Sequence, residues 1–161
     1  MPRQLDNLVF DRTQSDVDRV KQLTAALVAG TATAAERAEF VAGMKGAYNA
    51  TDLNRVGAAV EYLRDRLSDD AGTYVDVSPK TDWTETDIPN QQQATQYIAD
   101  IQNIRAAFLL PEGTPEAPDT LTGLTYSGAN AIETILYNLN ETIDALKITL
   151  ITSGEVFSGE V

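Results

Sequence analysis

The residues best suited to chemistry in this chain are three carboxylates that surround its single tryptophan. Asp82, Glu85 and Asp87 lie within one short segment, and Trp83 stands between the first two. Two carboxylates in such a loop could act as the acid and the nucleophile of a glycosidase, or bind a calcium ion. The segment lacks the glycine and the closing glutamate of an EF-hand loop, and its side chains suit a capped turn before Pro89 equally well. We therefore expect this loop to have a structural role.

The chain contains no histidine and no cysteine among its 161 residues. This composition excludes catalytic triads built on either residue, imidazole and thiolate metal sites, and disulfides. Neither of the glycine-rich phosphate-binding patterns, GxGxxG and GxxxxGK[ST], occurs. The sequence predicts a protein that is not an enzyme and that has no cofactor and no metal ion.

The net charge of −12 is concentrated in the second half of the chain. Residues 1–70 hold 9 Lys and Arg against 11 Asp and Glu, a net charge of −2, and residues 71–161 hold 3 against 13, a net charge of −10. An acidic surface repels phosphate backbones and anionic lipids, so neither nucleic acid nor a membrane is an expected partner. No apolar run is long enough to span a membrane, and the polar start does not resemble a secretory signal.

Apolar residues recur at helical spacing in five segments, which predicts a mainly α fold, a helical bundle of about five helices. We expect helices near 15–30, 33–44, 51–68, 90–110 and 126–152, one short β segment at 73–77, and an extended C-terminal strand. The expected caps of the first three helices are Ser15, Thr33 and Thr51, and Glu36 would complete a capping box with Thr33. Within one compact domain, residues 1–72 form an N-terminal three-helix region. Residues 73–120 hold the short strand, the Trp loop, a helix and a Pro-rich linker, and residues 121–161 hold the long C-terminal helix and its tail.

The last expected helix carries an apolar stripe with the spacing of a heptad repeat. Its members are Ile132, Leu136, Leu139, Ile143, Leu146 and Leu150. The stripe either packs along the other helices of the same chain or forms a contact between copies. Both interpretations stay open at the level of the sequence.

The chain closes on a duplicated segment, SGEVFSGEV, at 153–161. In an extended conformation Val156 faces one side, and Phe157 and Val161 face the other. A strand this short is not stable alone, so it would pair with an exposed edge, either of the 74–77 segment or of a neighbouring subunit. A frayed terminus is the alternative.

Three asparagines stand close before a core aliphatic residue. Asn54 precedes Val56 and Asn130 precedes Ile132 by two residues, and a related Asn103 directly precedes an isoleucine. An asparagine amide can bond the backbone of a neighbouring loop while the aliphatic side chain points into the core. The pattern predicts devices that fasten helices to loops.

The segments TDLNRVGAAVEYL, KTDWTETDIP, LTYSGANAIETIL and the closing SGEVFSGEV resemble small structural proteins, associated with the tail or baseplate, of tailed phages and prophages of Gram-positive bacteria. The matching positions are Thr51, Asp52, Asn54, Arg55, Asp82, Trp83, Thr125, Asn130 and the tail from Ser153. The resemblance covers most of the chain from Tyr48 onward, and its motifs are structural. It implies a subunit of the virion, made in the cytoplasm of the bacterial host, that contacts other virion proteins and forms a homo-oligomer in the assembly.

Two other functions remain open. A carbohydrate- or receptor-binding module of the tail apparatus would use Trp83, Tyr74, Asp82 and Asp87 as a platform for a host surface glycan, since aromatic faces beside carboxylates suit sugars. A small cytosolic regulator would instead use the acidity of the chain to imitate nucleic acid.

Overall fold

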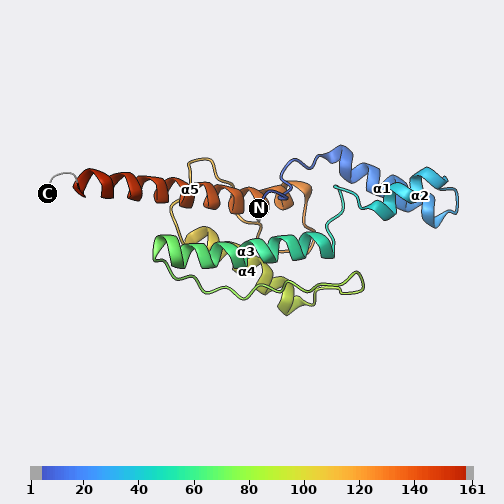
Figure 1. Ribbon diagram of the computed structural model, residues 1–161. Coiled ribbons are helices and arrows are strands. Elements are labelled where there is room, and N and C mark those ends of the chain that lie inside the picture. The colour runs from blue at the N-terminus through green and yellow to red at the C-terminus, as the bar shows by residue number, and fades with distance from the viewer. Residues whose placement is uncertain (1–4, 159–161) are drawn as a thin grey trace.

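The structure is a computed structural model that describes the backbone of residues 5–158 and the side chains of residues 5–149. Its described part holds five helices, α1 (Gln14–Val28), α2 (Ala34–Ala42), α3 (Ala50–Ala71), α4 (Gln91–Ala106) and α5 (Tyr126–Ser158) (Figure 1). The described residues contain no strand, so the fold is all-α and the expectation of about five helices is confirmed.

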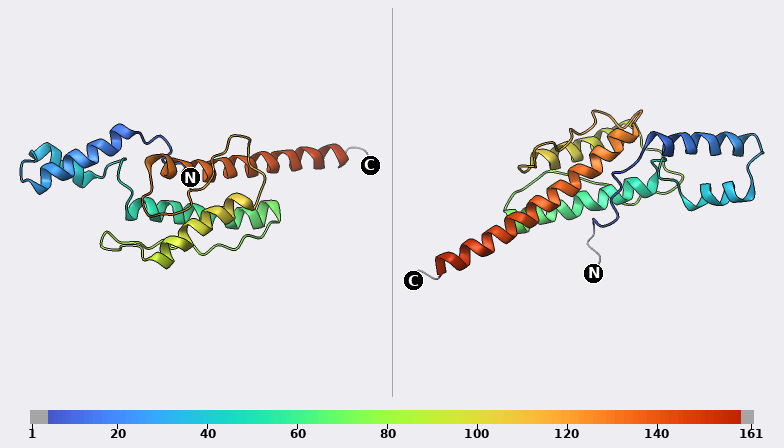
Figure 2. Two further views of the ribbon diagram at one scale, coloured as in Figure 1. Left: turned by 180° about the vertical axis from the view of Figure 1, so that it is seen from behind. Right: turned by 90° about the horizontal axis from the view of Figure 1, so that it is seen from above.

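Helices α3, α4 and α5 form a bundle in which they run in the same general direction (Figures 1 and 2). The pairing of α3 with α5 shows this directly, because Arg55 near the start of α3 contacts Glu133 near the start of α5, whereas Asp70 at the end of α3 contacts Lys147 much further along. Parallel neighbours cannot be joined by tight turns. The chain therefore returns twice along the bundle, through residues 72–90 and 107–125.

The core of the protein lies between these three helices. Apart from Leu23 of α1, the largest fully buried aliphatic side chains come from these three helices, and they are Val56, Leu63, Leu67, Ile101, Ile104, Ile132, Ile135, Leu136, Leu139 and Ile143. Burial of each such side chain stabilises the fold by roughly 1.5–3 kcal/mol. The helical spacing of these residues in the sequence is explained by this single shared core.

Helices α1 and α2 form a hairpin that projects from one end of the bundle, opposite to the end of α5 (Figures 1 and 2). Leu23 is completely buried, and Arg19 of α1 pairs with Glu39 of α2 at 2.6 Å. Outside this contact the hairpin exposes apolar side chains, with Val28 and Val41 each 85% exposed. The hairpin thus presents its own apolar surface to the solvent.

The β segment expected at 73–77 is wrong. Burial alternates as expected, with Val75 and Val77 buried, but no neighbouring strand exists in the described part of the chain. Helix α4 takes that place, since the Asn103 amide donates to the backbone carbonyl of Asp76 at 3.1 Å. A period of two indicates an extended chain on an apolar surface, and only a partner strand would make it a sheet.

Two of the expected helix starts are displaced by two residues. The caps of α1 and α3 are Thr13 and Asn49, where the sequence suggested Ser15 and Thr51. In both helices a capping box closes with an aspartate three residues after the cap, and an aspartate can replace the glutamate of the usual pattern. The expected capping box of Thr33 is confirmed.

The structure describes only part of the C-terminal tail. Helix α5 runs over Tyr126–Ser158, but the side chains of residues 150–158, and residues 159–161 altogether, lie outside the described residues. Leu150, Val156, Phe157 and Val161 belong to this part. The backbone of residues 153–158 belongs to α5, where the sequence predicted an extended strand, and docking through the tail stays a prediction.

Replacement of Gly57 by alanine should destabilise the protein, although alanine is favoured over glycine inside a helix by about 1 kcal/mol. A Cβ atom at position 57 would lie 2.5 Å from the carbonyl oxygen of Lys80, a backbone atom that cannot rotate away. We expect a net loss of roughly 1–3 kcal/mol in the free energy of unfolding, measured in urea. Gly128→Ala is the matched control, because the nearest atom there is the end of the Leu124 side chain at 3.0 Å. Equal stability of the two variants would contradict the close packing at Gly57.

Candidate functional site

A cluster of four charged side chains lies buried where the N-terminal segment crosses the bundle. Glu133 of α5 is completely buried, and it accepts hydrogen bonds from the Arg12 guanidinium at 2.8 Å, the Arg55 guanidinium at 2.7 and 3.0 Å, and the backbone N–H of Val9 at 2.6 Å. Asp52 accepts from Arg12 at 3.0 Å and from Arg55 at 2.6 Å. Two guanidiniums and two carboxylates cancel in charge, and each carboxylate is held by both arginines.

Arg12 is the centre of this cluster and is only 4% exposed. Its remaining donors bond the backbone carbonyls of Val9 at 2.6 Å and Lys45 at 3.2 Å. Asn130 fixes the backbone of Arg12 from the other side, accepting from its N–H at 3.1 Å and donating to its C=O at 2.9 Å. The cluster therefore joins the N-terminal segment, the loop before α3, and helices α3 and α5.

The hydrogen bonds of the cluster favour the charged form of Arg55. Burial alone would lower the pKa of Arg55, but hydrogen bonds to Glu133 and Asp52 outweigh burial and raise that pKa above its ordinary value. A buried pair of this kind adds little net stability compared with apolar residues, yet removal of one member leaves an uncompensated buried charge. Both carboxylates of the cluster are hydrogen-bonded to both guanidiniums, so the cluster holds together the segments that carry these four residues.

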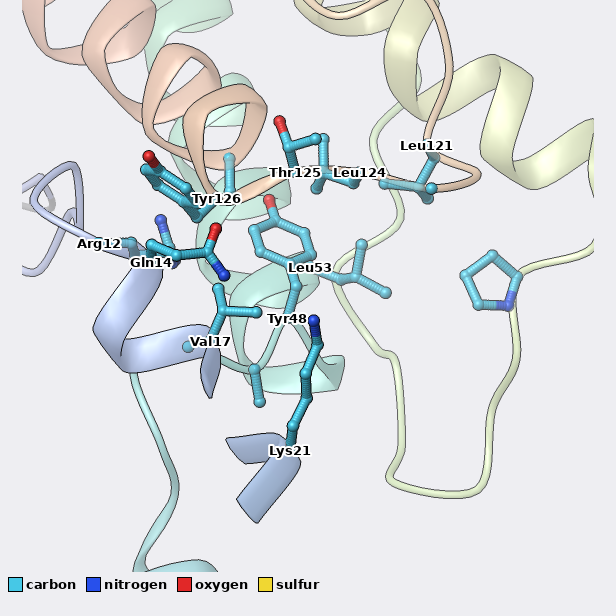
Figure 3. Close-up of a pocket in the computed structure, with 15 residues that line it drawn as sticks. Arg12, Gln14, Val17, Lys21, Tyr48, Leu53, Leu121, Leu124, Thr125 and Tyr126 are labelled. Atoms are coloured by element: carbon cyan, nitrogen blue, oxygen red, sulfur yellow. The ribbon is translucent and has the colours of Figure 1, made fainter. Parts of the chain in front are cut away.

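A pocket of about 620 Å³ opens beside the cluster, between the starts of α1, α3 and α5 (Figure 3). The surface of its walls is mainly apolar. Figure 3 shows Tyr48 and Leu53 within it and Lys21 reaching toward them from α1. The lining residues are Arg12, Gln14, Val17, Lys21, Gly46, Ala47, Tyr48, Leu53, Pro89, Leu121, Gly123, Leu124, Thr125, Tyr126 and Ala129. Its volume falls in the range of about 300–1,000 Å³ that is usual for ligand pockets.

The hydroxyl of Tyr48 lies 2.6 Å from the hydroxyl of Tyr97 on α4. Burial raises the pKa of both tyrosines well above the ordinary value. Both phenols are therefore neutral at physiological pH, and neither supplies a base. The pair connects the wall of the pocket with α4.

The loop around Trp83 is fastened to α3 by Asn54 and places its tryptophan in the core. The Trp83 ring is 6% exposed, and its indole nitrogen is buried without a hydrogen-bond partner among the described residues. The pKa of Asp82 is lowered by its hydrogen bond to Lys80, and the pKa of Asp87 is lowered by the backbone N–H of Thr84. A glycosidase acid needs a raised pKa instead, so these carboxylates do not suit that role.

Tyr74 does not complete a platform with Trp83. Its side chain is 84% exposed, whereas the tryptophan ring lies in the core and has the ammonium group of Lys80 5.0 Å from its centroid. Glu85 is exposed on the same loop as Asp82 and Asp87. The structure therefore does not bring these residues together around a common cavity.

The apolar stripe of the last helix divides into two parts. Ile132, Leu136, Leu139 and Ile143 are completely buried in the protein's own core. Leu146 is half-buried, and the side chain of Leu150 lies outside the described residues. The first four residues thus pack internally, and only the end of the stripe is left for a partner.

The expectation for the three asparagines is confirmed. The Asn54 amide donates to the backbone carbonyl of Trp83 at 2.8 Å and accepts from its N–H at 2.7 Å, just as Asn130 clamps Arg12. Asn103 makes the single bond to the 73–77 segment described above. The aliphatic residues that follow each of the three are completely buried.

Sequence reasoning missed the ion cluster and the pocket. Asp52 and Arg55 were noticed only as parts of a motif, and Arg12 and Glu133 were not noticed at all. One signal was present in the sequence, because Glu133 stands between Ile132 and Ile135 on a face of α5 that is otherwise apolar. A charge in such a position is either exposed by a twist of the helix or buried with a partner.

No group of three or more Asp, Glu, His or Cys side chains among the described residues is arranged to hold a metal ion. No helix there is long and apolar enough to cross a membrane. In comparisons with known proteins, no family model, no curated protein and no solved structure matches the chain.

Proposed function

We propose that this protein is a non-enzymatic structural or adaptor subunit of a phage virion, in the tail or baseplate region, which assembles through the end of its long C-terminal helix. The resemblance of its motifs to tail-associated proteins suggests the particle. The contacts of α5 suggest the mode of assembly.

The observation that carries the proposal is the unequal length of the two paired helices. Helix α3 ends at Ala71, and its Asp70 lies 3.4 Å from Lys147 of α5. Helix α5 continues for 11 residues beyond Lys147, to Ser158, which is about 16 Å at 1.5 Å per residue. This projecting part begins with Ile148, whose side chain is 66% exposed. A helix that carries apolar residues beyond its own bundle gains stability by packing against another chain.

The carbohydrate-binding alternative has weaker support. A sugar stacks on an exposed aromatic face, and the ring of Trp83 is buried. We therefore do not expect a Trp83→Ala substitution that leaves the fold intact to abolish the binding of a glycan.

The proposal is tested on particles released from the bacterium that carries the gene. Antibodies raised against the purified protein should label intact virions at the tail end in electron micrographs. Particles from a strain in which the gene is deleted are the control for unspecific labelling. Recovery of the protein only in the fraction without particles would contradict the proposal.

A further inference from the structure

The pocket beside the ion cluster is unusual for so acidic a protein, because none of its lining residues is an Asp or a Glu. Its cations are Arg12, which is held by Asp52 and Glu133, and Lys21. Lys21 is exposed and forms no ion pair with any described residue. Most other described Lys and Arg side chains, by contrast, are paired. The pocket therefore offers apolar walls and one uncompensated positive charge.

A segment of complementary chemistry exists in the same chain. Residues 150–161 read LITSGEVFSGEV, with apolar side chains at Leu150, Ile151, Val156, Phe157 and Val161, two glutamates, and no Lys or Arg. Apolar side chains suit the walls of the pocket, and glutamates suit Lys21. The duplicated SGEV places one glutamate on each side of Phe157.

The tail cannot enter the pocket of its own molecule. Ala129, near the start of α5, lines the pocket, and Phe157 follows 28 residues later in the same helix. At 1.5 Å per residue this separates them by about 42 Å along the axis. Figure 1 shows that α5 leads away from the hairpin end of the molecule, where the pocket lies. The partner must be a second copy.

We propose that residues 150–161 of one copy dock into the pocket between the starts of α1, α3 and α5 of the next copy. Phe157 and its aliphatic neighbours occupy the apolar part, and the glutamates beside it face Lys21. The inference rests on the proposed function as an assembly subunit and names the site at which the subunits meet.

Such a contact joins two different surfaces of the protein, the tail of one copy and the pocket of another. A row of copies joined in this way has a free tail at one end and a free pocket at the other. The row therefore grows as an open chain, or it closes into a ring when the last tail enters the first pocket. A symmetric contact through the apolar stripe of α5 would stop at a dimer. The two modes therefore differ in how mass grows with concentration.

The test uses light scattering on the full chain and on two full-length variants. Lys21→Glu reverses the charge of the pocket, and Phe157→Asp removes the apolar anchor of the tail. We expect the average mass of the wild type to rise beyond a dimer with concentration, and each variant alone to associate at least tenfold more weakly. An equimolar mixture of the two variants should stop at the mass of two chains, because each pair holds one intact tail in one intact pocket.

Arg37→Glu is the matched control, since Arg37 is also exposed and without an ion pair among the described residues but does not line the pocket. It should associate like the wild type. Circular dichroism should show unchanged helix content in all variants, as Lys21 has no partner to lose. Wild type that stays monomeric, Lys21→Glu that associates normally, or a mixture that grows beyond two chains would each overturn the proposal.

This result is independent of the particle experiment. Labelled virions together with a monomeric protein would overturn the docking site and leave the proposed function intact. Head-to-tail association together with unlabelled virions would do the reverse.

Discussion

Replacement of Glu133 by alanine is expected to lower the free energy of unfolding by about 3–5 kcal/mol, the usual cost of breaking a buried ion pair. The carboxylate accepts four hydrogen bonds from Arg12, Arg55 and Val9. Its loss leaves two buried guanidiniums with Asp52 as their shared carboxylate. Urea unfolding followed by circular dichroism measures the change.

Glu85→Ala is the matched control for this prediction, because Glu85 is exposed in the Trp loop and forms no ion pair with the described residues. A surface substitution of this kind is expected to change stability by less than about 0.5 kcal/mol. A Glu133→Ala protein as stable as the control would show that the N-terminal segment does not depend on the cluster.

Replacement of Asn54 by alanine is expected to cost about 2–4 kcal/mol. The amide satisfies both the N–H and the C=O of Trp83, and each buried backbone group left without a partner costs roughly 1–3 kcal/mol. The loop from 79 to 90 should also lose protection, because Asn54 fastens it to α3. Urea unfolding gives the stability, and hydrogen exchange at Trp83 gives the local opening.

Asn103→Ala provides the comparison within the same chain. Asn103 makes one bond, at 3.1 Å, and lies at an exposed position of α4. We expect its loss to cost about 1 kcal/mol or less. If both variants lost the same stability, the two bonds of Asn54 would not explain its role.

The sequence indicated those parts of the fold that depend on local spacing. Apolar residues at intervals of three and four marked all five helices, because a helix must turn one face to the core. The backbone contacts of the three asparagines could also be predicted, since a polar side chain beside a buried aliphatic residue has few hydrogen-bond partners other than a nearby backbone. The capping box at Thr33 was found because its glutamate follows the standard pattern.

Contacts between residues far apart in the sequence could not be predicted from local spacing. Arg12 and Glu133 are 121 residues apart, and the local sequence around either residue does not predict that the other is its partner. The parallel course of α3, α4 and α5 depends on two long connections, and the local sequence does not predict the path of either one. The segment at 73–77 shows the same limit, because its alternation gave the burial of Val75 and Val77 but not the helix that lies beside it.

The parallel course of the three bundle helices also aligns their helix dipoles. In an antiparallel bundle the dipoles of neighbouring helices largely cancel, whereas here they add, each helix contributing about half an elementary charge at either end. Asp70, at the C-terminal end of α3, is paired with Arg66 and Lys147, two cations that lie at the negative end of the helix dipole. The three helix dipoles therefore place partial positive charge at the hairpin end of the bundle and partial negative charge at the opposite end.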